Sequence, residues 1–161
     1  MKVLIAVDES NFASDVIDSV ISRSWPSESE FFLLTVVEMG TGWFSSSEYP
    51  SLESIDSTVA AGQSRLLDHV SALKRKLHNH RVYGELLKGG AADLIVRHAR
   101  DLTADLVILG CHGNNRHSHT LVGGVAEAVV HRAPCSVEVI KPRVRITPLE
   151  QRVKEGASVG Q

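Results

Sequence analysis

The chain has 161 residues, of which 43% are apolar and 22% are charged, and its formal net charge is −2 at pH 7. This length suits one domain with a real core, and the composition is that of a soluble globular protein rather than a disordered or membrane-bound one. The small negative charge argues against a nucleic-acid binder, which would carry a basic excess. No secretory signal is evident, and the two cysteines form no spaced framework, so we expect a cytoplasmic protein with free thiols.

The first half of the chain begins with a clear strand and helix pattern. Residues 2–7 form a β-branched apolar run that is typical of a strand buried on both faces. The polar residues 8–11 then offer capping side chains to a helix that extends to about residue 22. A second buried strand is predicted at 31–37, followed by a loop over 38–55 that is rich in glycine and serine and carries aromatic side chains.

A long amphipathic helix is predicted from residue 58 to about residue 78. Its expected apolar stripe comprises Leu66, Leu67, Val70, Leu73 and Leu77. Residues 82–87 predict a third strand, which we place at an edge of the sheet because it is less apolar than the others. A helix is predicted at 92–102, and its His98 is expected to have a hydrogen-bond partner.

The remaining elements complete a regular alternation. A strand is predicted at 105–109, a helix at 123–132 and a last strand at 136–140. Strands and helices that alternate in this way call for right-handed crossovers and a parallel sheet with helices on both faces. We therefore predict one doubly wound α/β domain over residues 1–141 and a mobile tail over 142–161, with ligands bound where the strands end.

The segment after the fourth strand carries the strongest functional signal. Gly110 and Gly113 follow the strand directly, and Gly123 and Gly124 come just before the next helix. Without a Cβ, glycine allows the backbone to approach a ligand closely, and a helix N-terminus attracts anions. The segment therefore predicts a phosphate receptor. The alternative interpretation is that the glycines only shape a long turn.

The glycines have the spacing Gly-x2-Gly-x9-Gly, and three other segments of the chain belong to the same pattern. The run from Ala104 to Gly110, the segment from His131 to Val137, and the opening Val3–Asp8 with Ser10 complete the pattern. Together these motifs resemble the universal stress protein family over residues 2 to about 141. The resemblance implies a five-stranded parallel sheet in the order 3-2-1-4-5 and a site for ATP or AMP, with Mg²⁺ as a further candidate, between strands 1 and 4.

The resemblance also implies a role for individual residues. Asp8 would contact the ribose or a phosphate-bound metal, and the backbone of Val36 would line the adenine pocket. The implied nucleotide-binding residues are Asp8, Val36, Gly110, Gly113, Gly123, Gly124 and Val125. This chain has Gly124 and Cys111 where the family pattern has serine or threonine, so a hydroxyl donor to phosphate is missing and weaker binding is expected.

Asp8 and the loop histidines can each be interpreted in a second, more ordinary way. Asp8 could simply cap a helix or form a turn, although its place at a strand end favours ligand contact. The histidines at positions 112, 117 and 119 could hold a transition metal, but no third ligand at a diagnostic spacing is evident. Solvated loop histidines, or neighbours of a phosphate, are the alternative interpretation, and we predict no metal site.

These observations leave three hypotheses for function. The first is a stress-response protein that binds ATP or AMP as a sensor or switch. The second is a homodimeric interaction module of the same family that binds no nucleotide and associates through the edge strand 136–140. The third is a slow ATP hydrolase or self-phosphorylating protein, which lacks support because no catalytic set is visible. Neither nucleic acid nor a membrane is an expected partner.

Overall fold

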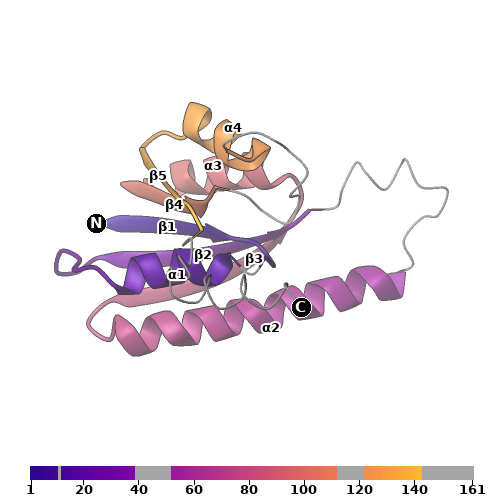
Figure 1. Ribbon diagram of the computed structural model, residues 1–161, viewed down its shortest axis with the longest axis horizontal. Coiled ribbons are helices and arrows are strands. Elements are labelled where there is room, and N and C mark those ends of the chain that lie inside the picture. Colours follow the sequence, from indigo (N-terminus) through magenta and orange to yellow (C-terminus); the bar gives the residue numbers. More distant parts are fainter. Residues whose placement is uncertain (11, 39–51, 112–121, 143–161) are drawn as a thin grey trace, which may run out of the picture.

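A computed structural model describes residues 1–10, 12–38, 52–111 and 122–142 of the chain. It contains an all-parallel five-stranded sheet in the order β3-β2-β1-β4-β5 (Figure 1). The elements in chain order are β1 (Lys2–Val7), α1 (Ala13–Ile21), β2 (Glu30–Val37), α2 (Leu52–Lys76), β3 (Arg81–Lys88), α3 (Ala91–Asp101), β4 (Leu106–Gly110), α4 (Gly124–Arg132) and β5 (Ser136–Ile140). This arrangement confirms the predicted α/β class and strand order, and it places β3 at an edge as expected.

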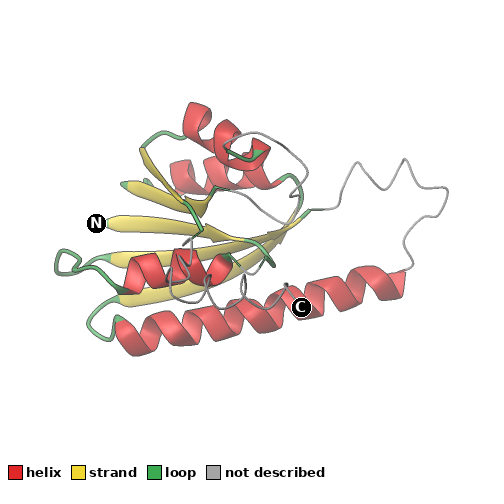
Figure 2. Ribbon diagram, in the orientation of Figure 1, coloured by secondary structure: helices red, strands yellow, loops and turns green. Residues whose placement is uncertain are grey.

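The helices cover both faces of the sheet (Figure 2). Successive side chains of a strand point to opposite faces, so β1 contributes to two separate apolar layers. Val3 and Ile5 pack on the side of α1 and α2, whereas Leu4 and Ala6 pack on the side of α3 and α4. Burial on both faces explains why the β1 sequence is apolar without alternation.

The structure corrects two details of the predicted helices. Helix α2 begins at Leu52 rather than at residue 58. Leu67 does not belong to its buried stripe, because 56% of this side chain is exposed, whereas Leu66 and Leu73 are buried. Residues 66, 70, 73 and 77 repeat at helical spacing, while residue 67 is rotated by about 100° from residue 66 and so leaves that face.

The start of α1 also differs from the prediction. The N-cap residue is Phe12, and no side chain caps it within the described residues. The polar side chains that precede it form a turn instead, as described below for Asp8 and Ser10. Asp8 and Ser10 use hydrogen-bonding capacity in this turn because the chain must reverse between β1 and α1.

Several predictions fall on residues that lie outside the described ranges. They are the aromatic side chains of the 38–55 loop, Gly113, the histidines at 112, 117 and 119, and the tail from residue 143. Within the described ranges, no helix combines the length and the apolar character that spanning a bilayer requires.

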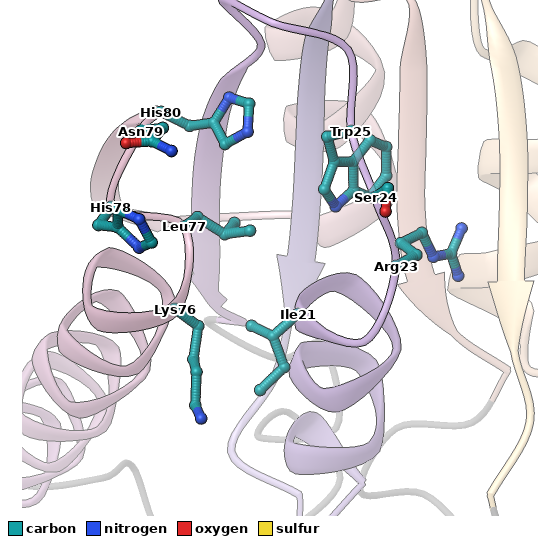
Figure 3. A pocket seen from close by; sticks show the side chains of 9 residues that line it. All are labelled: Ile21, Arg23, Ser24, Trp25, Lys76, Leu77, His78, Asn79 and His80. Carbon is teal, nitrogen blue, oxygen red and sulfur yellow. The ribbon is translucent and has the colours of Figure 1, made fainter.

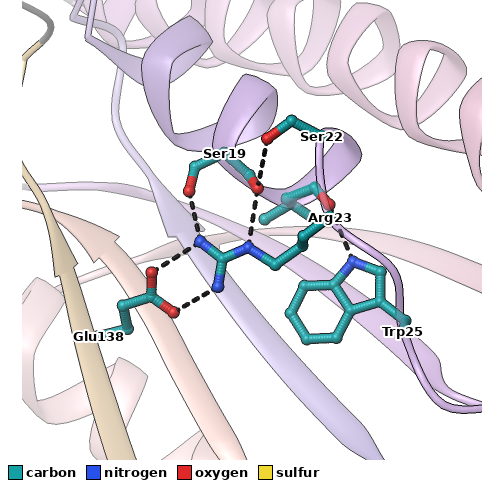
Figure 4. A network of polar contacts seen from close by, with 6 residues as sticks. Ser19, Ser22, Arg23, Trp25 and Glu138 are labelled. Atoms are coloured by element: carbon teal, nitrogen blue, oxygen red, sulfur yellow. Dashed lines mark hydrogen bonds and ion pairs between the residues drawn. The ribbon is translucent and has the colours of Figure 1, made fainter.

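A polar network ties α1 to the edge strand β5 (Figure 4). The Arg23 guanidinium donates two hydrogen bonds of 2.7 Å to the Glu138 carboxylate and a further bond of 2.9 Å to the Ser19 carbonyl oxygen. The bonded carboxylate raises the pKa of Arg23, and Arg23 in turn lowers the pKa of Glu138. The Trp25 indole lies beside the guanidinium, 5.5 Å from ring centroid to carbon, and donates 2.8 Å to the Val20 carbonyl. The network fastens the last strand to the first helix.

Candidate functional site

A cavity of about 910 Å³ lies at the carboxyl ends of β1, β2 and β4. Its volume is that of an ordinary small-molecule site. The floor is apolar, with Leu34 and Leu109 from the strands and Ile95 from α3. The rim is formed by the turn after β1, the end of β2 and the first residues of α3 and α4. The cavity therefore combines an apolar base with a polar, backbone-rich rim.

The structure brings most of the sequence-predicted site residues to this one cavity. Those that line it are Asp8, Val36, Gly110, Gly123, Gly124 and Val125. The remaining one, Gly113, lies outside the described residues. Cys111, where the family pattern has a hydroxyl residue, is 3% exposed and also lines the wall. Four elements of the fold thus meet around the predicted site.

The turn after β1 is held by side-chain hydrogen bonds. The Asp8 Oδ1 atom accepts from the Ser10 amide at 3.1 Å and from the Ser10 hydroxyl at 2.5 Å. The Ser10 hydroxyl oxygen in turn accepts from the Phe12 amide at 3.3 Å. Asp8 therefore forms a turn, as its ordinary interpretation predicted, and it does so from the wall of the cavity.

The start of α4 presents backbone to the cavity. Gly123 is the N-cap with an extended backbone, and no side chain among the described residues caps this helix. The Gly123 amide is tied to the Cys111 carbonyl at 2.6 Å, which anchors the helix start on the end of β4. A Cβ on Gly124 would meet no atom of the described residues within 4 Å, so this part of the chain leaves space beside the turn. The geometry is that of an anion-accepting helix N-terminus.

The start of α3 reaches the same cavity but is already engaged. The Ala91 amide donates to the Glu38 carboxylate at 3.2 Å, and both residues line the wall. A carboxylate at a helix N-terminus is favourable because the helix dipole is positive there. The start of α1 also reaches the cavity, at Phe12 and Ala13. Among the described residues no carboxylate caps the start of α4, although Glu127 lies in its first turn.

Sequence reasoning missed several wall residues. Glu9, Phe12, Glu38, Thr58, Ala91 and Ile95 also line the cavity. The helix start at Ala91 carried a signal, because Gly89 and Gly90 follow β3 and all parallel strands end at the same side of the sheet. Glu9 and Thr58 carried none, because their position depends on how α2 packs against β1 and β2.

A second, smaller hollow of about 260 Å³ lies at the opposite end of the sheet (Figure 3). It is formed where α1 and α2 end, with Ile21, Trp25 and Leu77 as apolar walls and Lys76 and His78 at its edge. Basic side chains at the last turn of a helix complement the negative end of its dipole. The helix end alone accounts for the position of Lys76.

The described residues supply no group of three histidine, cysteine or acidic side chains that could hold a metal ion. His98, which was expected to have a partner, pairs with Glu85 through its Nε2 atom at 2.9 Å. Both cysteines are free thiols, and burial raises the pKa of Cys135. The described part of the cavity wall offers backbone groups and the carboxylates of Asp8, Glu9 and Glu38.

The fold and the cavity together define a class of protein. In a sheet of order 3-2-1-4-5 the strand order reverses between β1 and β4, and doubly wound proteins bind ligands at this switch point. The model of the universal stress protein family matches residues 1–141. The chain belongs to the universal stress protein family.

Curated relatives agree with this assignment. A universal stress protein of Methanocaldococcus jannaschii is 38% identical over 61 residues, which cover 38% of this chain and only 36% of that protein. A putative universal stress protein of Staphylococcus epidermidis is 27% identical over 144 residues, which cover 86% of this chain and 82% of that protein.

Solved structures share the fold. The universal stress protein UspA from Lactobacillus plantarum has a TM-score of 0.71 at 22% identity, with 87% of this chain and 97% of that chain covered. A universal stress protein family protein from Arabidopsis thaliana, solved with AMP bound, has a TM-score of 0.61 at 19% identity, with 92% and 95% covered. The universal stress protein from Archaeoglobus fulgidus in complex with dAMP has a TM-score of 0.56 at 22% identity, with 88% and 98% covered.

Proposed function

We propose that this protein binds an adenine nucleotide, AMP or ATP, in the cavity at the carboxyl ends of β1, β2 and β4, and acts as a sensor or switch in a stress response. The observation that carries the proposal is the convergence of Asp8, Val36 and the Gly123–Gly124 helix start on one cavity of about 910 Å³. The AMP and dAMP complexes of proteins with the same fold support it.

The phosphates would lie at the start of α4. The helix dipole and the backbone amides of the first turn attract negative charge, and the space that the described residues leave beside Gly124 admits a phosphate. Glu38 already places a carboxylate on the start of α3, and its charge would repel a phosphate there. The two helix starts therefore orient the ligand, with its anionic end toward α4.

The nucleoside would extend from α4 across the end of β1 toward β2. Asp8 would contact the ribose, or a Mg²⁺ ion carried by the phosphates, and the backbone of Val36 would line the base. The apolar floor formed by Leu34 and Ile95 would cover one face of the base. Binding in this position would change the surface that the rim presents to a partner protein. A protein that catalyses no reaction can act as a switch in this way, because the ligand favours one of its conformations.

Calorimetric titration of the full chain with AMP and ATP at low salt tests the proposal. We expect saturable binding that weakens severalfold in Asp8→Asn, which keeps an oxygen for the Ser10 contacts but loses the charge. Asp68→Asn, an exposed position on α2, is the matched control and should bind as the parent does. Absence of binding up to millimolar nucleotide would contradict the proposal.

We further propose a homodimer through β5, which lies at the edge of the sheet. Val137 and Val139 are only partly buried there, and an edge strand offers unpaired backbone groups to a second copy. Sedimentation analysis with and without AMP distinguishes a nucleotide-dependent dimer from an interaction module that needs no ligand. A cytoplasmic location is part of the proposal, in keeping with the free thiols Cys111 and Cys135.

A further inference from the structure

One carboxylate oxygen in the cavity wall lacks the partner that a buried polar atom normally has. The Glu9 Oε1 atom is buried and has no hydrogen-bond partner, and the only other such side-chain atom among the described residues is His80 Nδ1. Glu9 lines the cavity, directly after Asp8. Buried polar atoms without partners are rare in folded proteins, and each one calls for a physical explanation.

The Glu9 Oε1 atom lies near apolar side chains. A Cβ on Gly62 of α2 would lie 3.1 Å from Glu9 Oε1, 3.1 Å from the Leu86 side chain and 3.6 Å from the Val37 side chain. The absence of a side chain at Gly62 is what gives the carboxylate its place between α2 and the sheet. The Arg65 guanidinium donates to the main-chain oxygen of Glu9, and none of the ion pairs of the described chain includes the Glu9 carboxylate.

Glu9 and the anion-accepting helix start lie at opposite ends of the cavity. Val37 and Leu86 belong to β2 and β3, whereas Gly123 is tied through Cys111 to the end of β4. Because the sheet order is β3-β2-β1-β4, the strand β1 separates these two ends. A nucleotide with its phosphates at α4 would therefore direct its base toward the end of β2, where Glu9 lines the cavity from the side of α2 and Leu34 and Ile95 line it from the side of α3.

We propose that Glu9 is a specificity-determining residue that selects a base with an amino group. This inference rests on the proposed function. An ionised carboxylate only accepts hydrogen bonds, so it attracts an amino group of the base and repels a carbonyl oxygen in the same place. The terminal torsion of glutamate is broad, so a rotation brings a carboxylate oxygen from its covered position to the ligand.

The test compares AMP with inosine monophosphate, which carries a carbonyl group where AMP carries its amino group. Both are titrated calorimetrically into the parent protein, Glu9→Gln and Glu28→Gln. We expect the parent to prefer AMP by about tenfold or more, as a hydrogen bond to a charged group predicts. In Glu9→Gln the preference should fall to about twofold or less, because an amide both donates and accepts. Glu28 is exposed and lies outside the cavity, so Glu28→Gln should keep the full preference.

The outcomes separate this inference from the function on which it rests. If the parent binds AMP but does not prefer it to inosine monophosphate, or if Glu9→Gln keeps the preference, the proposed role of Glu9 is wrong. The proposed nucleotide site is unaffected by either result. If neither nucleotide binds the parent, both proposals fail. A melting curve of the unliganded proteins adds a second readout, because removing a charge whose Oε1 atom is buried without a partner should leave the melting temperature of Glu9→Gln unchanged or raised. Should Glu9→Gln not fold, Glu9→Asp keeps the charge and should keep the preference for AMP.

Discussion

Polar groups at the two ends of the sheet differ in how many hydrogen-bond partners they have. At the amino ends of the strands, polar side chains are paired with one another or with backbone. The Arg23 network joins α1 to Glu138 on β5 (Figure 4), and the Ser29 hydroxyl, on a buried residue, donates 2.7 Å to the Pro26 carbonyl. The Lys2 ammonium donates 3.0 Å to the Leu102 carbonyl. These contacts fasten elements that are distant in the sequence.

At the carboxyl ends, hydrogen-bonding capacity is left over. Among the described residues, no side chain caps the start of α4 at Gly123, and the Glu9 Oε1 atom has no partner. The amino end has one exception, the buried His80 Nδ1 atom. At the carboxyl ends, contacts such as Asp8 with Ser10 and Glu38 with Ala91 therefore stand beside groups that remain available to a ligand, as expected for a scaffold that carries its function on loops and helix starts.

The largest effect is expected from a change at the amino ends of the strands. Phe31 is fully buried there, and its ring packs edge-on against Trp25 at 5.1 Å and His80 at 5.5 Å between centroids. Phe31→Ala should lower the free energy of unfolding by about 3–5 kcal/mol, because it leaves a cavity in the core. Urea unfolding measures this loss.

The AMP affinity of the Phe31→Ala variant tests whether the two ends of the sheet are independent. The folded fraction of Phe31→Ala should bind AMP as the parent does, because Phe31 does not line the cavity. Tyr83→Ala, which removes an aromatic ring that is 45% exposed, is the control and should cost clearly less stability. A large loss of AMP affinity with Phe31→Ala would show that the two ends are coupled.

The next effect is expected at the carboxyl ends of the strands. Gly124→Ser adds a hydroxyl donor in the space that the described residues leave beside the start of α4, so it should tighten AMP and ATP binding by about tenfold or more. Calorimetry measures the change, and Gly124→Ala is the matched control, since it adds the Cβ without the hydroxyl. Equal affinities for the two variants would place the phosphates elsewhere. Neither variant should lose stability, because glycine is a poor helix former.

The smallest effect is expected from the Arg23–Glu138 pair. Both side chains are 34% exposed, so solvent screens the pair, and Glu138→Gln should lower the free energy of unfolding at pH 7 by about 1 kcal/mol or less. Arg23 lowers the pKa of Glu138, so the contribution is complete above the usual carboxyl pKa of about 4.3 and is lost as the pH falls through the lowered value. The stability difference between parent and variant should therefore shrink in acid. A stability difference that grows as the pH falls would contradict the lowered pKa of Glu138.

Much of the candidate site could be anticipated because it follows from local patterns. Strand ends and glycine positions are visible in the sequence, and parallel strands end at one side of the sheet, so Asp8 and the glycine segment after β4 were expected at one cleft. The place of Val36 was implied only by the resemblance to the universal stress protein family. The errors came from side-chain packing. Leu67 was assigned to the buried stripe of α2 although its helical angle turns it outward.

The amino-acid sequence by itself determined the order of the elements and the parallel topology, because apolar periodicity and chain handedness are local properties with few solutions. The family was indicated separately, by the resemblance of the glycine motif and the segments around it. Only the tertiary structure decided which polar groups find partners. Arg23 and Glu138 are separated by 115 residues, Glu38 meets the start of α3 across the end of the sheet, and Glu9 is left without a partner beside Gly62. Such pairings depend on how remote side chains pack in three dimensions, and no pattern along the chain specifies that packing.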